Sequence, residues 1–306
     1  MELQQCPILS DLDFEPIGQE MIPTLVRRFR EMNLKCCDYS VGGVIIWIEY
    51  FDYKMAVYKD TLLLRGVDPA TGTLLYYRPI GHLSREEAYT LFRQDASGRK
   101  AMFVDFEEKM LDADYDSSSL SNDPYGYRDW DEYLYPIRNF IGFPGKKMSK
   151  KRNHLNYFQA HYSFDIEPLR QDNVEEAIAL SERLDALHFD DPMFIRENAQ
   201  CVRMLRQLEN TPMFGIAVRV DGQVEGYAFG EVIGDTLFEH VEKADASFHG
   251  LYQLLASEIA RLGEERGALW INREDDMGSD DLRQSKLSYK PTLMVCKKLY
   301  PLDSSF

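Results

Sequence analysis

Charged side chains are grouped at two points in the second half of the chain. The first group lies in the segment FEHVEKAD (residues 238–245), and the second directly follows the apolar segment ALWIN (268–272). If both segments are strands of one α/β layer, their charged ends lie where such layers tend to hold a site. There a carboxylate can accept a proton or hold an ammonium group, and a cation can face an oxyanion or a phosphate. The candidates for these catalytic roles are Glu242, Lys243, Asp245, Arg273, Glu274 and Asp275.

The same charges also have a purely structural interpretation. They could form a buried ion-pair lattice that joins the two strands, with Lys243 paired to a neighbouring acid. Alternatively, FEHVEKAD could be an edge strand beside a solvated loop. Strict alternation places His240 and Glu242 on one face of the strand and Glu239 and Lys243 on the other. Charges on both faces of a central strand are costly without a use, which favours a site.

A dense basic segment, GKKMSKKRNHLNYF, spans Gly145–Phe158 in a chain whose formal net charge is −16. Its cations could neutralise a phosphate group, and nearby glycines would allow close approach. A tRNA, coenzyme A and an anionic lipid headgroup would all suit this segment. The alternatives are a solvated linker and a patch that docks on the chain's own acidic loop. The phosphate-binding candidates are Lys146, Lys147, Lys150, Lys151, Arg152, Asn153 and Asn156.

Three further candidates follow the second strand. Arg283, Lys286 and Tyr289 recur at near-helical spacing and should face one side of a short helix, where they either line the site or brace the loop. Asn272 is expected to end its strand and shape the turn. We expect Tyr252, on the preceding helix, to serve packing.

The elements that position these residues can be read from periodicity. Apolar residues at three- and four-residue spacing predict a helix over 248–262 between the two charged strands. Asp221-Gly222 predicts a hairpin between strands 213–220 and 223–233, after helices over 174–187 and 199–208. The first half predicts a helix over 18–32, strands over 44–51, 54–58, 61–65 and 73–78, a helix over 85–95 capped by Ser84, and a strand over 101–106. Residues 112–131 read as an acidic loop, and 293–299 as a hairpin-like end.

Length and composition limit the number of domains, the use of metals and the cellular compartment. The 306 residues suit two domains, which we place at 1–140 and 164–306, with a basic inter-domain segment at 141–163. Histidines and cysteines lack metal-ligand spacing, so we expect no metal. The five cysteines, without a CxxC pair, indicate free thiols in a reducing compartment. The N-terminus lacks a signal-like pattern and no apolar run could span a bilayer, which predicts a cytoplasmic protein without a transmembrane segment.

Several of these motifs together resemble one family. The series HVEKAD, G-L-Y-Q, INREDDMG and LRQSKLSYKP, with the basic segment before it, is similar to the phosphatidylglycerol lysyltransferase C-terminal domain family in its stand-alone form. The resemblance covers most of the second half. It implies an α/β fold with a mixed sheet, built from two tandem GNAT-like acyltransferase domains. The best-known members of that family move an amino acid from aminoacyl-tRNA to a lipid headgroup, while stand-alone members lack the membrane-spanning half.

Three functions follow as hypotheses. The first is an aminoacyl-tRNA-dependent transferase that needs no cofactor and whose acceptor is a lipid headgroup, a peptide or a small amine. The second is an N-acyltransferase that uses acyl-CoA, and the third is a binding module on a GNAT scaffold. Acetyl-CoA enzymes of the GNAT class usually carry a glycine-rich pyrophosphate turn before the long helix. Here that place reads DASFHGLY with Gly250 alone, which favours the first hypothesis over the second.

Overall fold

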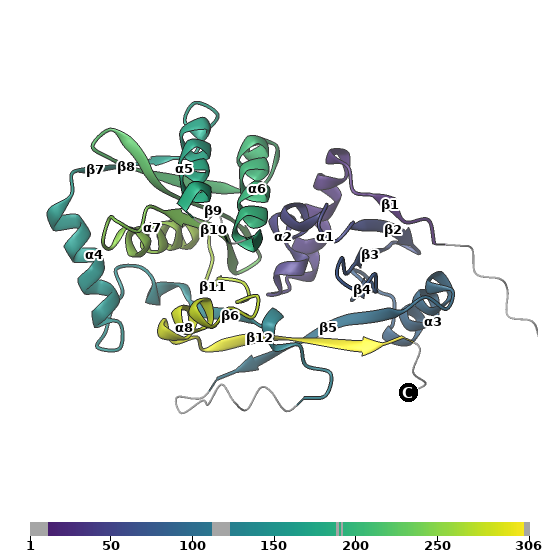
Figure 1. The fold of residues 1–306 in the computed structure, drawn as a ribbon. Coiled ribbons are helices and arrows are strands. Elements are labelled where there is room, and N and C mark those ends of the chain that lie inside the picture. Colours follow the sequence, from purple (N-terminus) through teal and green to yellow (C-terminus); the bar gives the residue numbers. More distant parts are fainter. Residues whose placement is uncertain (1–11, 112–122, 188–189, 191, 303–306) are drawn as a thin grey trace, which may run out of the picture.

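The computed structural model describes residues 12–111, 123–187, 190 and 192–302. Its strands form one mixed sheet, which runs across the whole molecule (Figure 1). In spatial order the strands are β1 (Glu15–Pro16), β2 (Lys54–Tyr58), β3 (Thr61–Val67), β4 (Leu74–Tyr77), β5 (Ala101–Met110), β12 (Leu293–Pro301), β6 (Glu132–Pro136), β11 (Trp270–Asn272), β10 (Thr236–Ala244), β9 (Gln223–Ile233), β8 (Phe214–Val220) and β7 (Phe164–Pro168).

The two halves of the chain exchange strands at the middle of this sheet. Strand β12, from the end of the chain, pairs antiparallel with β5 along its whole length and with β6 over Leu293–Val295. Strand β6, from the first half, in turn pairs with β11. Two of the strand pairs in the sheet, β4 with β5 and β10 with β11, are parallel. The division into domains at residues 140 and 163 stays a prediction.

The helices cover the sheet and its edges (Figure 1). Most of the predicted helices are confirmed, including the capping box in which Ser84 Oγ accepts the backbone N–H of Glu87 at 3.2 Å. None of the helices in the described ranges is long and apolar enough to cross a membrane. Their bounds are α1 (Ile22–Met32), α2 (Val41–Trp47), α3 (Arg85–Ala96), α4 (Ser149–His161), α5 (Val174–Leu187), α6 (Pro192–Gln207), α7 (Leu251–Glu265) and α8 (Asp280–Ser288).

Two predicted elements are wrong. Residues 44–51, expected as a strand, are the second half of helix α2 and the turns that follow it; Ser40, before the helix, accepts the N–H of Gly43 at 3.0 Å. The run VGGVII is buried on every side, and an evenly apolar run carries no period that separates helix from strand. The hairpin-like end at 293–299 is one straight strand, β12. Most of the predicted acidic loop, residues 112–122, lies outside the described residues, while Arg128–Trp130 form a short 3-10 turn.

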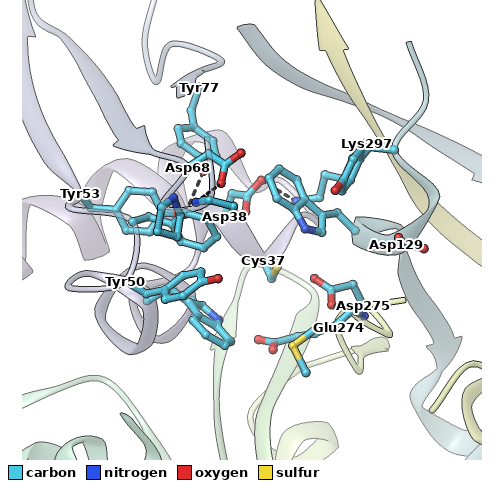
Figure 2. Close-up of a pocket in the computed structure, with 18 of the residues that line it drawn as sticks. Cys37, Asp38, Tyr50, Tyr53, Asp68, Tyr77, Asp129, Glu274, Asp275 and Lys297 are labelled. Carbon is cyan, nitrogen blue, oxygen red and sulfur yellow. Dashed lines mark hydrogen bonds and ion pairs between the residues drawn. The ribbon is translucent and has the colours of Figure 1, made fainter. Parts of the chain in front are cut away.

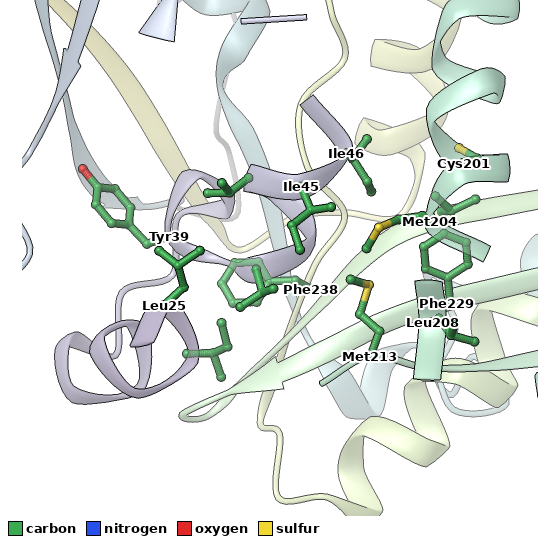
Figure 3. Close-up of a cluster of buried hydrophobic side chains, with 14 of the residues drawn as sticks. Leu25, Tyr39, Ile45, Ile46, Cys201, Met204, Leu208, Met213, Phe229 and Phe238 are labelled. Carbon is green, nitrogen blue, oxygen red and sulfur yellow. The ribbon is translucent and has the colours of Figure 1, made fainter. Parts of the chain in front are cut away.

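One hydrophobic cluster joins α2, in the first half of the chain, to the second half. Ile45 and Ile46 of α2 pack in it with Met204 of α6 and Phe229 of β9 (Figure 3). A second cluster lies under α7, around Leu254, and includes residues of α4 and β6. Helix α2 therefore lies against the strands that carry the predicted site, although its residues are distant in sequence.

Candidate active site

A cleft opens where β10 and β11 part. The two strands pair in parallel only over Thr236–Phe238 and Trp270–Asn272. Beyond these residues β10 continues, while the segment that follows β11 turns away from it. Asn272 ends its strand and shapes the turn, as predicted: its Oδ1 accepts the N–H of Glu274 at 2.7 Å. Glu274 has a left-handed φ of 57°. The resulting cleft has a volume of about 940 Å³.

A β-bulge at His240 determines which charged side chains of β10 lie on the same face of the sheet. The register with β9 shifts between Glu239 and Val241, so His240 is left without a partner in the ladder. Strict alternation would place Glu239 and Glu242 on opposite faces, and that prediction is wrong. The extra residue returns Glu242 to the face of Glu239, because a bulge adds one position to one strand.

Arg273 joins these two carboxylates. Its guanidinium donates to Glu239 and to Glu242, and its side chain is only 14% exposed. The guanidinium also lies 5.2 Å from the ring centre of Tyr289 and 5.5 Å from that of Phe140. Burial raises the pKa of Glu242 well above its usual range, although Arg273 opposes this. The ion-pair lattice expected as the structural alternative therefore exists at Arg273.

One atom of the lattice is not satisfied by the protein. Glu239 Oε1 is buried and has no hydrogen-bond partner among the described residues. A buried carboxylate oxygen without a donor is costly, so it marks a place where a ligand or a proton would be stabilised. Glu239 is not among the residues selected from the sequence, although strict alternation places it on the same face as the candidate Lys243.

On the opposite face of β10, His240 joins two further carboxylates, those of Glu231 and Glu274. Its Nδ1 lies 2.7 Å from Glu274 Oε1, and its Nε2 lies 3.1 Å from Glu231 Oε1. Burial alone would lower the pKa of His240, but the hydrogen bonds to the two carboxylates raise it to about 9. The ring is therefore an imidazolium at neutral pH. No sequence spacing could have revealed this residue, because Glu231 and Glu274 reach it from two other segments.

The two lysines of the predicted site are held in different ways. Lys243 Nζ is 2.9 Å from Glu197 of α6, the pairing expected under the structural alternative. Lys286 Nζ donates to the backbone carbonyl of Arg273 at 2.5 Å and to that of Asp275, and so fixes the loop after β11. Burial lowers the pKa of Lys286.

Asp275 and Lys151 have side chains whose pKa values are moved toward neutrality. Burial raises the pKa of Asp275 to about 7, while its carboxylate accepts the N–H of Met277 at 3.0 Å. Lys151 reaches the cleft from α4, with Nζ 3.8 Å from the ring centre of Tyr289. Burial, and then the charge of Arg273, lower the pKa of Lys151 to about 8. Each group can therefore change its protonation state near neutral pH.

Half of the predicted residues line the cleft, namely Lys151, Glu242, Lys243, Arg273, Glu274, Asp275, Lys286 and Tyr289. Tyr252, expected to serve packing, also lines the cleft, and it is 37% exposed. Its hydroxyl donates to the backbone carbonyl of Ala244 at 3.2 Å, so Tyr252 also packs against the end of β10. Lys286 and Tyr289 reach the cleft from the end of α8, and Lys286 also braces the loop after β11.

The other predicted residues lie outside the cleft. Asp245 accepts the N–H of Ser247 in the turn after β10. Arg152 donates to the carbonyls of Phe143 and Gly145, and Arg283 braces the loop by pairing with Asp276 at 2.8 Å. Exposed positions on and before α4 hold the remaining five, Lys146, Lys147, Lys150, Asn153 and Asn156. Among the residues described, no group of three or more potential ligands could hold a metal ion.

The N-terminus of α7 is covered by α4. Gly250, with a φ of 95°, precedes the helix, and a Cβ at this position would lie 2.1 Å from the carbonyl oxygen of His154. The rings of His154 and His249 lie 4.5 Å apart. A helix N-terminus binds phosphate only when its first N–H groups are accessible. Here the backbone of α4 lies against the N-terminus of α7.

Comparison with solved structures defines the class of this fold. It is similar to a tandem GNAT protein from the clavulanic acid biosynthesis pathway, with a TM-score of 0.50 and 10% identity over 97% of this chain and 100% of that one. The protein is thus an α/β protein with a mixed sheet, and its fold is like that of tandem GNAT proteins. A conserved protein of unknown function from Bacteroides thetaiotaomicron is much more similar, with a TM-score of 0.81 and 24% identity over 95% of this chain and 100% of that one.

The chain belongs to the phosphatidylglycerol lysyltransferase C-terminal family, whose model matches residues 29–297. L-PGS from Bacillus licheniformis is similar in fold, with a TM-score of 0.57 and 15% identity over 95% of this chain and 96% of that one. A protein of Mycoplasmoides gallisepticum is 28% identical over 172 residues, which are 55% of this chain and 54% of that protein. That match spans about half the length of the relative. The family takes its name from an enzyme that transfers a lysyl group.

Proposed function

We propose that this protein is an aminoacyl transferase that takes its acyl group from aminoacyl-tRNA and passes it to an amine or hydroxyl acceptor. The position of α4 carries the proposal. Lys151 of α4 lines the cleft, and Lys146, Lys147 and Lys150 are exposed on the same basic segment. A polyanion bound along this segment would therefore have its end at the cleft. A tRNA has such an end, which carries the aminoacyl ester.

The covered N-terminus of α7 supports tRNA over acyl-CoA as the donor. In the usual acyl-CoA pose the pyrophosphate accepts N–H groups at the start of this helix. The carbonyl of His154 lies there instead, and it is an acceptor that would repel a phosphate oxygen. The basic segment provides a phosphate site at the mouth of the cleft rather than at α7.

Asp275 is the residue we propose as general base. The acceptor's nitrogen or oxygen attacks the ester carbonyl and gives its proton to Asp275, whose pKa of about 7 suits proton transfer at neutral pH. As the new bond forms, the ester C–O bond breaks, and Asp275 passes the proton to the ribose oxygen, which leaves as the hydroxyl of the tRNA. Lys151, whose Nζ lies over the ring of Tyr289 in the cleft, supplies positive charge for the developing oxyanion. A lipid headgroup, a peptide and a small amine are all chemically suitable acceptors.

Binding of tRNA by the purified protein, measured across a salt series, tests the proposal. A variant with Lys146, Lys147, Lys150 and Lys151 changed to Gln should lose affinity and show a shallower salt dependence. The matched control removes four other exposed charges, Arg27, Arg30, Lys59 and Lys100, and should bind as the parent does. Binding of acyl-CoA without tRNA would replace the proposal with the second hypothesis. Binding of neither donor would contradict both.

A further inference from the structure

A second cavity, of about 380 Å³, adjoins the cleft beside helix α2 (Figure 2). Trp47, Glu274, Asp275 and Met277 line both spaces, so a molecule in the second cavity would lie next to the proposed base. We call this cavity the aromatic pocket. Its rings are those of Trp47, Tyr50, Phe51, Tyr53, Tyr77, Tyr127 and Trp130.

The rings of the aromatic pocket form a connected wall. Trp47 and Phe51 lie 6.3 Å apart between ring centres, Phe51 and Trp130 lie 6.1 Å apart, and Trp130 and Tyr127 lie 4.7 Å apart. These rings come from two segments, residues 47–53 and 127–130, that the fold brings together. Ring faces carry negative potential, so a wall of this kind attracts a cation.

The same pocket carries an excess of carboxylates, Asp38, Asp68, Asp129, Glu274 and Asp275. Three of them already have a cationic partner: Lys297 pairs with Asp38, Arg283 with Asp129 at 2.9 Å, and His240 with Glu274 at 2.7 Å. In Figure 2, Tyr50 and Tyr53 lie on one side of the pocket and Asp129, Glu274 and Asp275 on the other.

The other two carboxylates take part in no ion pair with the described residues. Asp68 accepts the N–H of Ala70 and the hydroxyl of Thr71, and Asp275 accepts the N–H of Met277. Lys297 also lines the pocket, but its side chain is only 3% exposed and its Nζ lies 2.7 Å from Glu132 Oε1. That ammonium is already neutralised, so the pocket offers little to an anion.

We propose that the aromatic pocket binds an organic ammonium group, held by the ring wall and by Asp68 and Asp275. The inference rests on the proposed function in one respect, because the ammonium then belongs to a substrate of the same transfer. Two sources fit this chemistry: a cationic side chain on the donated amino acid, and an amine on the acceptor. Both would bring the ammonium next to the junction of the pocket and the cleft.

Calorimetric titration of the full chain with 1,4-diaminobutane tests the inference without any tRNA. The neutral isostere 1,4-butanediol should not bind, and glycerol 3-phosphate should not displace the amine. Asp68→Asn and Tyr127→Leu should each weaken amine binding by about tenfold, because each removes one attraction for the cation. Asp52→Asn, an exposed acid next to Phe51 that does not line the pocket, is the matched control and should bind as the parent does.

Two arms separate the sources of the ammonium. If the donor's side chain occupies the pocket, lysine amide and arginine amide bind more tightly than both alanine amide and the diamine. If the acceptor's amine occupies it, the diamine gains the mass of an aminoacyl group in the presence of aminoacyl-tRNA. Equal binding of the diol, displacement by glycerol 3-phosphate, or unchanged binding in Asp68→Asn overturns the inference. Amine binding without any transfer contradicts the proposed function alone.

Discussion

The backbone of Gly42 in α2 lies directly against the ring of His240 in β10. A Cβ at Gly42 would lie 2.3 Å from Nε2 of that ring. The same turn of α2 donates the N–H of Gly42 to Glu231 at 2.6 Å, and Glu231 in turn contacts His240. The first half of the chain is thus fitted to the imidazolium that holds Glu274 at the cleft.

Gly42→Ala should destabilise the protein by about 1–3 kcal/mol, because the added methyl group must displace either α2 or the His240 ring. Denaturant unfolding measures the change in the free energy of unfolding. A double-mutant cycle with His240→Ala provides the control, since removing the ring should relieve part of the clash. Strictly additive effects would contradict a direct contact between the two residues.

The protonation of His240 should make stability depend on pH. Its pKa is about 9 in the folded protein and about 6.5 in an unfolded chain, so the folded state binds the proton more tightly. The stabilisation is complete below pH 6.5 and is lost as the pH rises through 9. It amounts to as much as about 3 kcal/mol, from the difference between the two pKa values.

Unfolding measured from pH 6 to 9.5 checks this, with His240→Gln as the comparison. The parent should lose stability across that window, and the variant should lose less. Parallel curves for the two proteins would show that His240 is not the titrating group.

Asp275→Asn should lower kcat/KM for the transfer reaction by about 10²–10⁴-fold, because the general base is removed. In the parent, kcat/KM should rise with pH through about 7, where Asp275 loses its proton. The variant should lack that rise while its Tm stays close to the parent value. A full pH–rate profile of both proteins is the measurement. A large loss of Tm with an unchanged profile would assign Asp275 a structural role.

Arg273→Met should cost about 3–5 kcal/mol, because Glu239 and Glu242 are left buried without their cation. The triple variant Arg273→Met, Glu239→Gln, Glu242→Gln should recover much of that loss, since no unpaired charge remains. Thermal and denaturant unfolding of both variants checks the expectation. If the single variant is as stable as the parent, the three side chains do not form the lattice in solution.

The sequence predicts the charged residues of the cleft better than their arrangement. Arg273, Glu274 and Asp275 could be selected because charges directly after an apolar strand are unusual. The bulge at His240 could not be predicted, because a bulge depends on the register with β9 and leaves no periodic pattern in β10. Without the bulge, Glu239 and Glu242 would lie on opposite faces and Arg273 could not join them.

The contribution of the first half of the chain was the least predictable part. Helix α2 reads as a strand because its residues are apolar on every side, and its glycines give no hint that His240 lies against Gly42. The aromatic pocket is lined by residues of several segments, among them 47–53, 68–71, 127–130 and 274–277, which are adjacent only in the folded chain. Contacts of that range follow from topology, which sequence periodicity does not encode.

Because β12 lies between β5 and β6, the centre of the sheet can form only after the end of the chain has been synthesised. Strand β5 is complete at residue 110, but its partner is residues 293–301, so both β5 and β6 keep open edges while most of the chain emerges from the ribosome. Open edges of this kind invite pairing with other chains, and distant pairing slows folding. A nascent chain that stalls before residue 293 therefore exposes two strand edges at the centre of its sheet, and we expect such fragments to depend on chaperones and to aggregate.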